Sequence, residues 1–319
     1  MDADSSKKAV LIALGVNFSI FLTKAIGAWV SGSAVMFSES LHSLADMFNS
    51  IFLLIGIFLA LRPPDQDHPF GYGKEVYFWS FMASIFMLGV TSAGSIYEGV
   101  RHILHANIEK SLCFPFIVLV VSLCSECFAV NVAANSVLKD LKIQQRGLKK
   151  LLYALCHFHQ VSNPALKFVF IEDTLAFLGA LLALAALILI KTTGIILFDG
   201  LVSVIIGLML GFMALLFAKQ NKEMIIGQAA PDRLEQAIGD AALAVDSVAD
   251  VSELKTMVLG PQDLLVNMEI EIAPSTTVEK LDGILADVER KIRSNIPLVK
   301  HLSIKVAPDD YIQEWPKAL

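Results

Sequence analysis

Charged side chains are scarce in this chain of 319 residues. Asp, Glu, Lys and Arg together make up 18% of it, while hydrophobic residues make up 55%. Soluble domains carry about 25% charged residues, so this composition argues for a protein that lies largely in a membrane. Basic residues are not in excess either, because the formal net charge is −6. Nothing in the charge balance points to a nucleic-acid partner.

Cysteine is also rare. The four cysteines are Cys113, Cys124, Cys127 and Cys156. Cys124 and Cys127 form a CxxC pair, but the pair lies in an apolar run and no second pair accompanies it. Such a set does not make the disulfide framework of small secreted proteins. We expect the pair to be small buried hydrophobic residues, since free cysteines commonly pack in that way.

Motifs of several enzyme classes are missing. The sequence after residue 227 contains no phosphate-binding loop, nucleophile elbow or dinucleotide fingerprint. The apolar part lacks the HExxH pair that a membrane metalloenzyme would need. The sequence therefore predicts a protein that is not an enzyme and that carries no prosthetic group.

Six long apolar runs fill the first two thirds of the chain. They cover residues 9–30, 34–61, 76–104, 112–138, 168–190 and 198–217. Each is near or above the roughly 20 residues that a membrane-spanning helix needs. The first run is longer than the apolar part of a signal peptide and lacks a convincing cleavage site. The sequence predicts a multi-pass α-helical membrane protein with six transmembrane helices.

Basic residues are distributed unevenly between the loops. If the N-terminus is cytoplasmic, the opposite side of the membrane holds only Arg101, Lys110 and Lys191, and the other Lys and Arg residues around the spans lie on the cytoplasmic side. This asymmetry follows the positive-inside rule and predicts that both termini are cytoplasmic. We expect an integral protein of the bacterial inner (plasma) membrane.

The character of the sequence changes near Gln228. Helical spacing is found in residues 231–245 and 277–292, and strand patterns in residues 251–259, 264–272 and 299–306. The order helix, strand, strand, helix, strand predicts a small α+β domain with its helices on one face of the sheet. We therefore expect two domains, a transmembrane domain of residues 1–227 and a cytoplasmic domain of residues 228–319.

Ionisable residues interrupt two of the apolar runs. His42 and Asp46 are four residues apart and share one face of a helix, and Glu172 and Asp173 interrupt another span. Such groups are costly inside a membrane and usually mark a pathway or a site. His42 and Asp46 could instead bond only to each other and brace two helices. The additional acidic pair favours a cation site in the middle of the membrane.

Several segments resemble the cation diffusion facilitators, in particular the zinc-transporter-nine-like branch and its bacterial relatives. They are SESLHSLAD, HPFGYGKE, NPALKFVFIEDTLAFLGALLAL, LFDGLVSVIIGLML and IIGQAAPD, and the similarity covers nearly the whole chain. The resemblance implies six transmembrane helices with a C-terminal cytoplasmic ferredoxin-like α+β domain. It also implies a homodimer through the C-terminal domain, and efflux of a divalent metal, often Zn²⁺, in exchange for protons.

The resemblance also implies a set of metal ligands. The family's ligands fall on His42 and Asp46 in the second span and on Asp173 in the fifth. A fourth position, one turn before Asp173, holds Val169, so Glu172, a water or a fourth-span group such as Glu126 is expected to take its place. One imidazole and several carboxylates suit Zn²⁺, and they also suit Mn²⁺, Fe²⁺ or Co²⁺. A non-transporting membrane scaffold or metal sensor of the same fold is the remaining alternative.

Four further places have weaker signals. Asp65 and His68 match two ligands of a second metal site in some relatives, where the third position here holds Tyr72; the alternative is a tight turn shaped by proline and glycine. The connector at residues 139–167 holds Cys156, His157 and His159, which could bind a metal but are expected to lie in a solvated segment near lipid headgroups. His301 is predicted to be a strand surface residue, and Asp199 a helix-start or packing residue.

Overall fold

The computed structural model describes residues 3–105, 113–141, 143, 148–158, 161, 164–274 and 276–315. By backbone packing the chain divides into two compact units. The membrane unit is Met1–Ile55 with Trp79–Asn221, and the C-terminal unit is Gly56–Phe78 with Lys222–Leu319. The ends of two spans and the loop between them thus pack with the C-terminal unit. The domain boundary expected between residues 227 and 228 stays a prediction.

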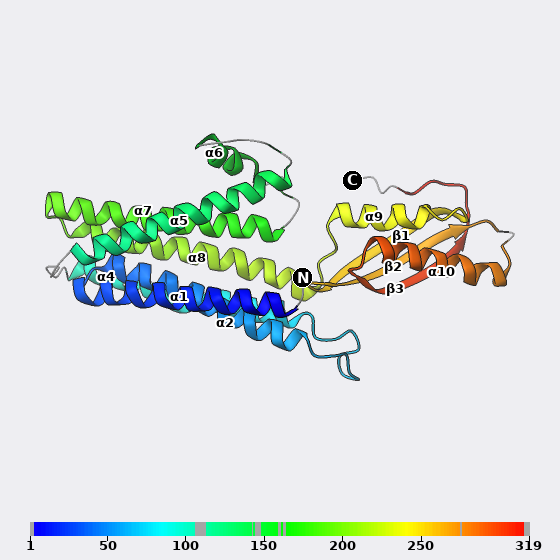
Figure 1. Cartoon of the computed structure of the whole chain (residues 1–319), viewed down its shortest axis with the longest axis horizontal. Helices are drawn as coiled ribbons and strands as arrows, with labels where there is room; N and C mark the ends of the chain where they lie inside the picture. The colour runs from blue at the N-terminus through cyan, green and yellow to red at the C-terminus, as the bar shows by residue number, and fades with distance from the viewer. Residues whose placement is uncertain are drawn as a thin grey trace. The chain divides into compact units, whose positions relative to one another are not determined.

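Within the described residues, six helical spans are long and apolar enough to cross a membrane, and they coincide with the six predicted runs (Figure 1). The first two are α1 (Ala3–Ser31) and α2 (Ala34–Ala60). The third consists of α3 (Glu75–Phe86), a π-helical turn η1 (Met87–Ser92) and α4 (Ala93–Leu104). The others are α5 (Cys113–Asp140), α7 (Pro164–Thr193) and α8 (Leu197–Ile226). The prediction of a multi-pass membrane protein is confirmed.

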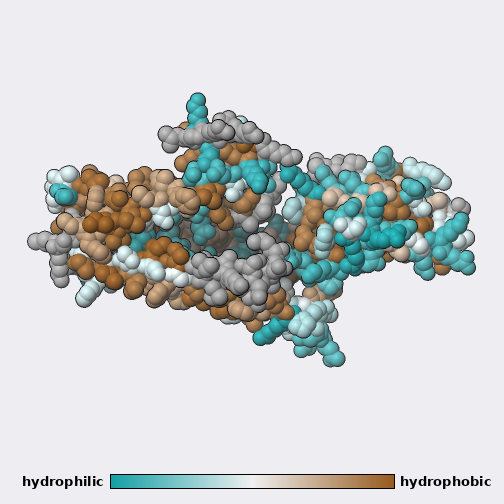
Figure 2. Space-filling view, viewed as in Figure 1, coloured by the Kyte–Doolittle hydropathy of each residue, from teal (hydrophilic) through white to brown (hydrophobic). Residues whose placement is uncertain are grey.

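The outer surface of these helices is apolar. Trp29 is 85% exposed and Phe128 71%, which would be costly in water. Figure 2 shows hydrophobic side chains over the helices of the membrane unit and mainly hydrophilic ones over the C-terminal unit. In a bilayer, the exposed apolar side chains contact lipid and the polar ones that lie inside the bundle are withdrawn from it.

Glycine and serine allow α4 and α8 to pack very closely. A β carbon on Gly99 would lie 2.8 Å from the carbonyl oxygen of Gly200, and one on Gly211 would lie 2.7 Å from the Ser92 hydroxyl. Small residues of this kind let the backbones of membrane helices approach each other. This contact holds the π-helical part of the third span against α8.

The connector between the fourth and fifth spans contains a helix that the sequence analysis missed. Helix α6 (Leu148–His157) buries Ala154 in a cluster with residues of α5 and α7. The ammonium of Lys150, which is only 8% exposed, donates to Asn135 Oδ1 at 2.8 Å. The expectation of a solvated connector is therefore wrong for this face of α6, since apolar and amide groups of α5 cover it.

The C-terminal unit contains the predicted α+β domain. Its elements are α9 (Asp232–Leu243), β1 (Val248–Gly260), β2 (Asp263–Ile272), α10 (Val278–Asn295) and β3 (Val299–Pro308). The strand order is β1-β2-β3, with β1 and β2 antiparallel and β2 and β3 parallel. Alternate residues of β2, from Leu264 to Ile270, are buried in one core with residues of both helices. The prediction of helices on one sheet face is confirmed.

The loop between α2 and α3 packs on the β1–β2 turn of this unit. A β carbon on Gly73 would lie 2.6 Å from the Leu259 carbonyl oxygen, so only glycine fits there without a shift. The Lys74 ammonium donates to the Ile225 carbonyl oxygen at 3.1 Å. The loop therefore has a defined place against the C-terminal domain.

Candidate metal centre

One face of α2 carries the histidine and aspartate predicted to bind a cation. His42 Nε2 lies 3.6 Å from Asp46 Oδ2, and both side chains are largely withdrawn from the surface. Their spacing of one helical turn accounts for this contact. The pair is not sealed in the packing between helices, because both residues line an open cavity.

A cavity of about 330 Å³ lies among α1, α2, α5 and α7. It is lined by the four predicted site residues and by Glu126, the fourth-span group considered as a replacement ligand. Polar neutral side chains complete the lining, among them Asn17, Ser43, Asn49, Ser50 and Ser125. The fold thus places an imidazole and four carboxyl groups around one space inside the membrane unit.

Glu172 and Asp173 face different parts of this space. Adjacent residues on a helix point about 100° apart. Glu172 also lines a smaller cavity next to His42, whereas Asp173 lines a groove toward α5 that includes Val169. Both residues nevertheless line the larger cavity together with Asp46, so both can act on one ion there, from two sides of α7.

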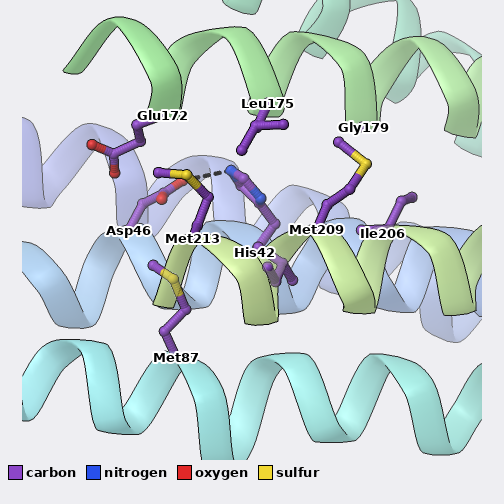
Figure 3. A pocket seen from close by; sticks show the side chains of 10 residues that line it. His42, Asp46, Met87, Glu172, Leu175, Gly179, Ile206, Met209 and Met213 are labelled. Atoms are coloured by element: carbon purple, nitrogen blue, oxygen red, sulfur yellow. Dashed lines mark ion pairs between the residues drawn. The ribbon is translucent and has the colours of Figure 1, made fainter. Parts of the chain in front are cut away.

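The smaller cavity has a volume of about 20 Å³ (Figure 3). His42, Asp46 and Glu172 line one part of it, and three methionines from the third and sixth spans line another. A cavity needs about 10–15 Å³ to hold one water molecule. This space is therefore of the size of a single water or a single desolvated ion.

A buried ion pair lies beside the site and was missed from the sequence. Lys24 Nζ of α1 lies 2.8 Å from Glu39 Oε2 of α2, and both side chains are almost fully buried. Glu39 is three residues before His42, so it lies one turn along the same helix. The signal was available, because a lysine inside an apolar run is itself a mark of function or pairing.

Asp199 has a larger role than the predicted helix-start residue. It lies in the first turn of α8 and is fully buried. Its carboxylate accepts hydrogen bonds from the Ser33 hydroxyl at 2.6 Å, from the Val35 amide at 3.1 Å and from the Ala34 amide. His102 Nε2 of α4 lies 3.3 Å from Asp199 Oδ2. Asp199 therefore caps the N-terminus of α2 and joins it to α8.

The cysteines do not lie where the sequence analysis expected them. All four are exposed, and Cys124 and Cys127 lie on the outer surface of α5. The interpretation as buried residues is wrong, because α5 turns this side away from its neighbours. On α6, His157 stacks on Tyr153 with ring centroids 4.1 Å apart, and His159 lies outside the described residues.

The loop after α2 forms a tight turn through Asp65. Tyr72 donates its hydroxyl proton to Asp65 Oδ2 at 2.6 Å, and the His68 amide donates to Oδ1 at 2.7 Å. The hydrogen bond from Tyr72 is the main cause that lowers the pKa of Asp65 below its usual value. Both oxygens have partners within the loop, and a second metal site here stays a prediction.

His301 lies in β3, as expected, but it is only partly exposed. Its Nε2 lies 3.7 Å from Asp263 Oδ1, and its ring packs edge-on against Phe70 with centroids 5.1 Å apart. The histidine therefore contacts the α2–α3 loop, which the sequence did not indicate.

Comparison with known protein families agrees with this architecture. The profile of the cation efflux transmembrane domain matches residues 10–226. The profile of the cation efflux protein cytoplasmic domain matches residues 230–309.

Individual relatives support the same relationship. The chain is 32% identical over 268 residues to the proton-coupled zinc antiporter SLC30A9, mitochondrial, of Xenopus laevis, an alignment that covers 83% of this chain and 46% of that protein. It is 28% identical over 275 residues to metal tolerance protein C4 of Arabidopsis thaliana, covering 86% and 59% of the two chains. It is 24% identical over 316 residues to the manganese efflux system protein MneP of Bacillus subtilis (strain 168), covering 97% of each.

The chain spans about half the length of the first of these relatives. The two profiles nevertheless account for both units, and the first alone covers more than half of the chain. With its six apolar spans and its C-terminal α+β domain, the chain belongs to the cation efflux family.

Proposed function

We propose that this protein exports a divalent metal cation, with Zn²⁺ as the expected cargo, in exchange for protons. The observation that carries the proposal is the cavity into which one imidazole and four carboxyl groups face, within helices whose outer surface is apolar. Ionisable groups in such a place are expensive unless a cation or protons neutralise them. The relatives named as zinc and manganese transporters support a metal cargo.

His42, Asp46, Asp173 and Glu172 are the proposed ligands. His42 and Asp46 offer a nitrogen and an oxygen from α2, and Asp173 and Glu172 offer oxygens from α7. Such a mixed set suits four-coordinate Zn²⁺, although Mn²⁺, Fe²⁺ and Co²⁺ accept the same donors. Glu126 on α5 stands on the same cavity and can supply the donor that Val169 lacks.

Proton exchange follows from the chemistry of these ligands. A metal binds a deprotonated imidazole and ionised carboxylates, so its binding releases protons and its departure allows them to return. An alternating-access cycle with the site open to one side at a time would couple the two movements. We further propose a homodimer joined through the C-terminal domain and an orientation with both termini in the cytoplasm, in agreement with the distribution of basic residues.

Flux into vesicles tests the proposal. Purified protein is reconstituted into liposomes that contain a metal-sensitive dye, and Zn²⁺, Mn²⁺, Fe²⁺ and Co²⁺ are added outside under an imposed pH gradient. We expect uptake of Zn²⁺ that rises when the vesicle interior is more acidic. His42→Ala, Asp46→Ala and Asp173→Ala should abolish it, and Glu172→Ala should weaken it.

Glu98→Gln is the matched control, because Glu98 is an acidic residue of α4 that pairs with Arg101 and lies outside the cavity. Its flux should equal that of the wild type. Flux that ignores the pH gradient would exclude antiport. Stoichiometric metal binding without flux would favour the scaffold or sensor, and wild-type flux in His42→Ala would exclude the proposed site.

A further inference from the structure

Three methionines converge on the small cavity beside His42. Met87 is the first residue of the π-helical turn η1, and Met209 and Met213 lie four residues apart on one face of α8. Met87 and Met213 are almost fully buried. Figure 3 shows the end of Met213 on the side of Asp46 and Glu172, the end of Met209 turned toward Gly179, and Met87 on the helix of the third span; all three line the cavity that His42 lines.

The lining of this cavity is divided by chemistry. Asp46 and Glu172 present oxygen, His42 presents nitrogen, and the methionines present sulfur. The remaining lining residues are aliphatic or glycine. Because the space is about 20 Å³, an ion that entered it would have shed most of its water and would contact the walls directly.

Thioether sulfur distinguishes between divalent metals. It is a soft donor, which suits metals of borderline or soft character such as Zn²⁺ and Cd²⁺, whereas Mn²⁺ and Mg²⁺ prefer carboxylate, carbonyl and water oxygens. The carboxylates alone would not separate these ions. Methionine also fills irregular gaps in cores, so packing alone is the competing explanation.

The backbone around Met87 favours a functional explanation. A π-helical turn is rare and often lies at a functional site, since the extra residue in the turn redirects the side chains around it. Here the turn begins at the methionine that lines the cavity. The contact of Gly211 with Ser92 at the other end of the turn fixes it against α8, the helix that carries the other two methionines.

We propose that Met87, Met209 and Met213 are specificity-determining residues, whose thioethers contact the cation in the small cavity and give the protein a preference for thiophilic divalent ions over Mn²⁺ and Mg²⁺. The inference rests on the proposed metal transport and names the class of cargo. The small, sulfur-lined cavity and the larger carboxylate-lined cavity share His42, Asp46 and Glu172 in their linings. An ion can therefore pass from one cavity to the other while it remains in contact with these three residues.

Competition binding to the purified full chain tests the inference without transport. Binding of Cd²⁺ and Mn²⁺ is measured for the wild type, for each single Met→Leu variant and for the triple variant. Leucine nearly conserves volume and apolar character, so it removes the sulfur with little loss of packing. We expect the ratio of Cd²⁺ to Mn²⁺ affinity to fall at least about tenfold in the triple variant, by RT ln 10 or more in binding free energy. X-ray absorption of bound Cd²⁺ should show sulfur neighbours in the wild type and none in the triple variant.

Met82→Leu and Met36→Leu are the matched controls. Met82 lies in α3 and Met36 in α2, and neither lines the small cavity. Both variants should keep the wild-type ratio. If the triple variant does not fold, the single variants Met209→Leu and Met213→Leu carry the test, each with an expected fall of at least about twofold, which is a third of the triple effect on a logarithmic scale.

The outcomes separate the two proposals. If the wild type binds no divalent metal, the proposed function fails. The proposed site is supported if the wild type binds Cd²⁺ and Mn²⁺ and His42→Ala weakens the binding of both. If the methionine variants then keep the wild-type ratio of affinities and bound Cd²⁺ has no sulfur neighbour, the methionines serve only packing and the inference is wrong.

Discussion

Breaking the buried pair of Lys24 and Glu39 should strongly destabilise the membrane unit. Lys24→Met leaves the carboxylate of Glu39 only 2% exposed and without its ammonium partner. Removing one partner of a buried ion pair costs about 3–5 kcal/mol, because an uncompensated charge remains. Glu39→Met should cost a similar amount. Lys24→Met/Glu39→Met replaces the pair by apolar side chains, and it should recover most of the loss.

Reversible unfolding in mixed detergent micelles, followed by tryptophan fluorescence, would give the free energies for the cycle. Lys191→Met is the matched control, since Lys191 is an exposed lysine near the end of α7, and it should change stability by less than about 0.5 kcal/mol. The reasoning is refuted if both single variants unfold like the wild type, or if the double variant loses as much as the two single variants together.

Three other predictions concern residues outside the cavity. Asp199→Ala removes the acceptor for the first amides of α2; we expect a loss of at least about 2 kcal/mol and faster hydrogen exchange of those amides, measured by mass spectrometry. Tyr72→Phe removes the main cause of the lowered pKa of Asp65, so the pKa should rise toward its usual value, as carbon NMR of the carboxyl group would detect. Gly239→Ala places a β carbon 2.1 Å from the Trp315 ring and should destabilise the C-terminal domain by about 1–3 kcal/mol, measured by thermal unfolding.

Each of these has a contradicting result. Unchanged exchange at the start of α2 would mean that Asp199 is not its cap. The sign for Asp65 is fixed by linkage: a lowered folded-state pKa stabilises the loop above the usual carboxyl pKa, and the contribution is lost as pH falls through the lowered value. A titration of Asp65 that ignores Tyr72→Phe would exclude the hydrogen bond as its cause. Gly283→Ala, where a β carbon meets nothing within 4 Å, is the control for Gly239→Ala and should not destabilise.

The spans and the C-terminal elements could be predicted because each depends on a local pattern. Hydropathy over about 20 residues identifies a spanning helix whatever its neighbours are. The alternation of buried residues in β2 and the helical stripe in α10 likewise repeat within one element. The proximity of His42 and Asp46 could be predicted for the same reason, because one helical turn separates them.

Contacts between distant segments could not be predicted in this way. Asp199 caps a helix that begins 165 residues earlier in the chain, and Ser38 meets Ser203 across the same distance. The methionines of α8 have ordinary spacing for a packed helix, and only the structure shows that they meet Met87 beside His42. Cys124 and Cys127 point outward because the neighbouring helices cover the other side of α5. Hydropathy does not show which side of a helix its neighbours cover.

The balance of charge around the cavity favours an exchanger over a static brace. Lys24 pairs with Glu39 and does not line the cavity; among the described residues that line it, His42 is the one basic side chain, beside four carboxyl groups. If His42 and Asp46 only bonded to each other to hold two helices together, one carboxyl group would suffice. The other three carboxyl groups would then add only electrostatic repulsion and the cost of desolvation. Such an excess is tolerable if the space always holds positive charge. A divalent ion can supply it in one state and protons in another, because neither the empty ionised cavity nor a cavity with both occupants is electrostatically favourable. Alternation between the two occupants is the cycle that the proposed exchange of metal and protons requires.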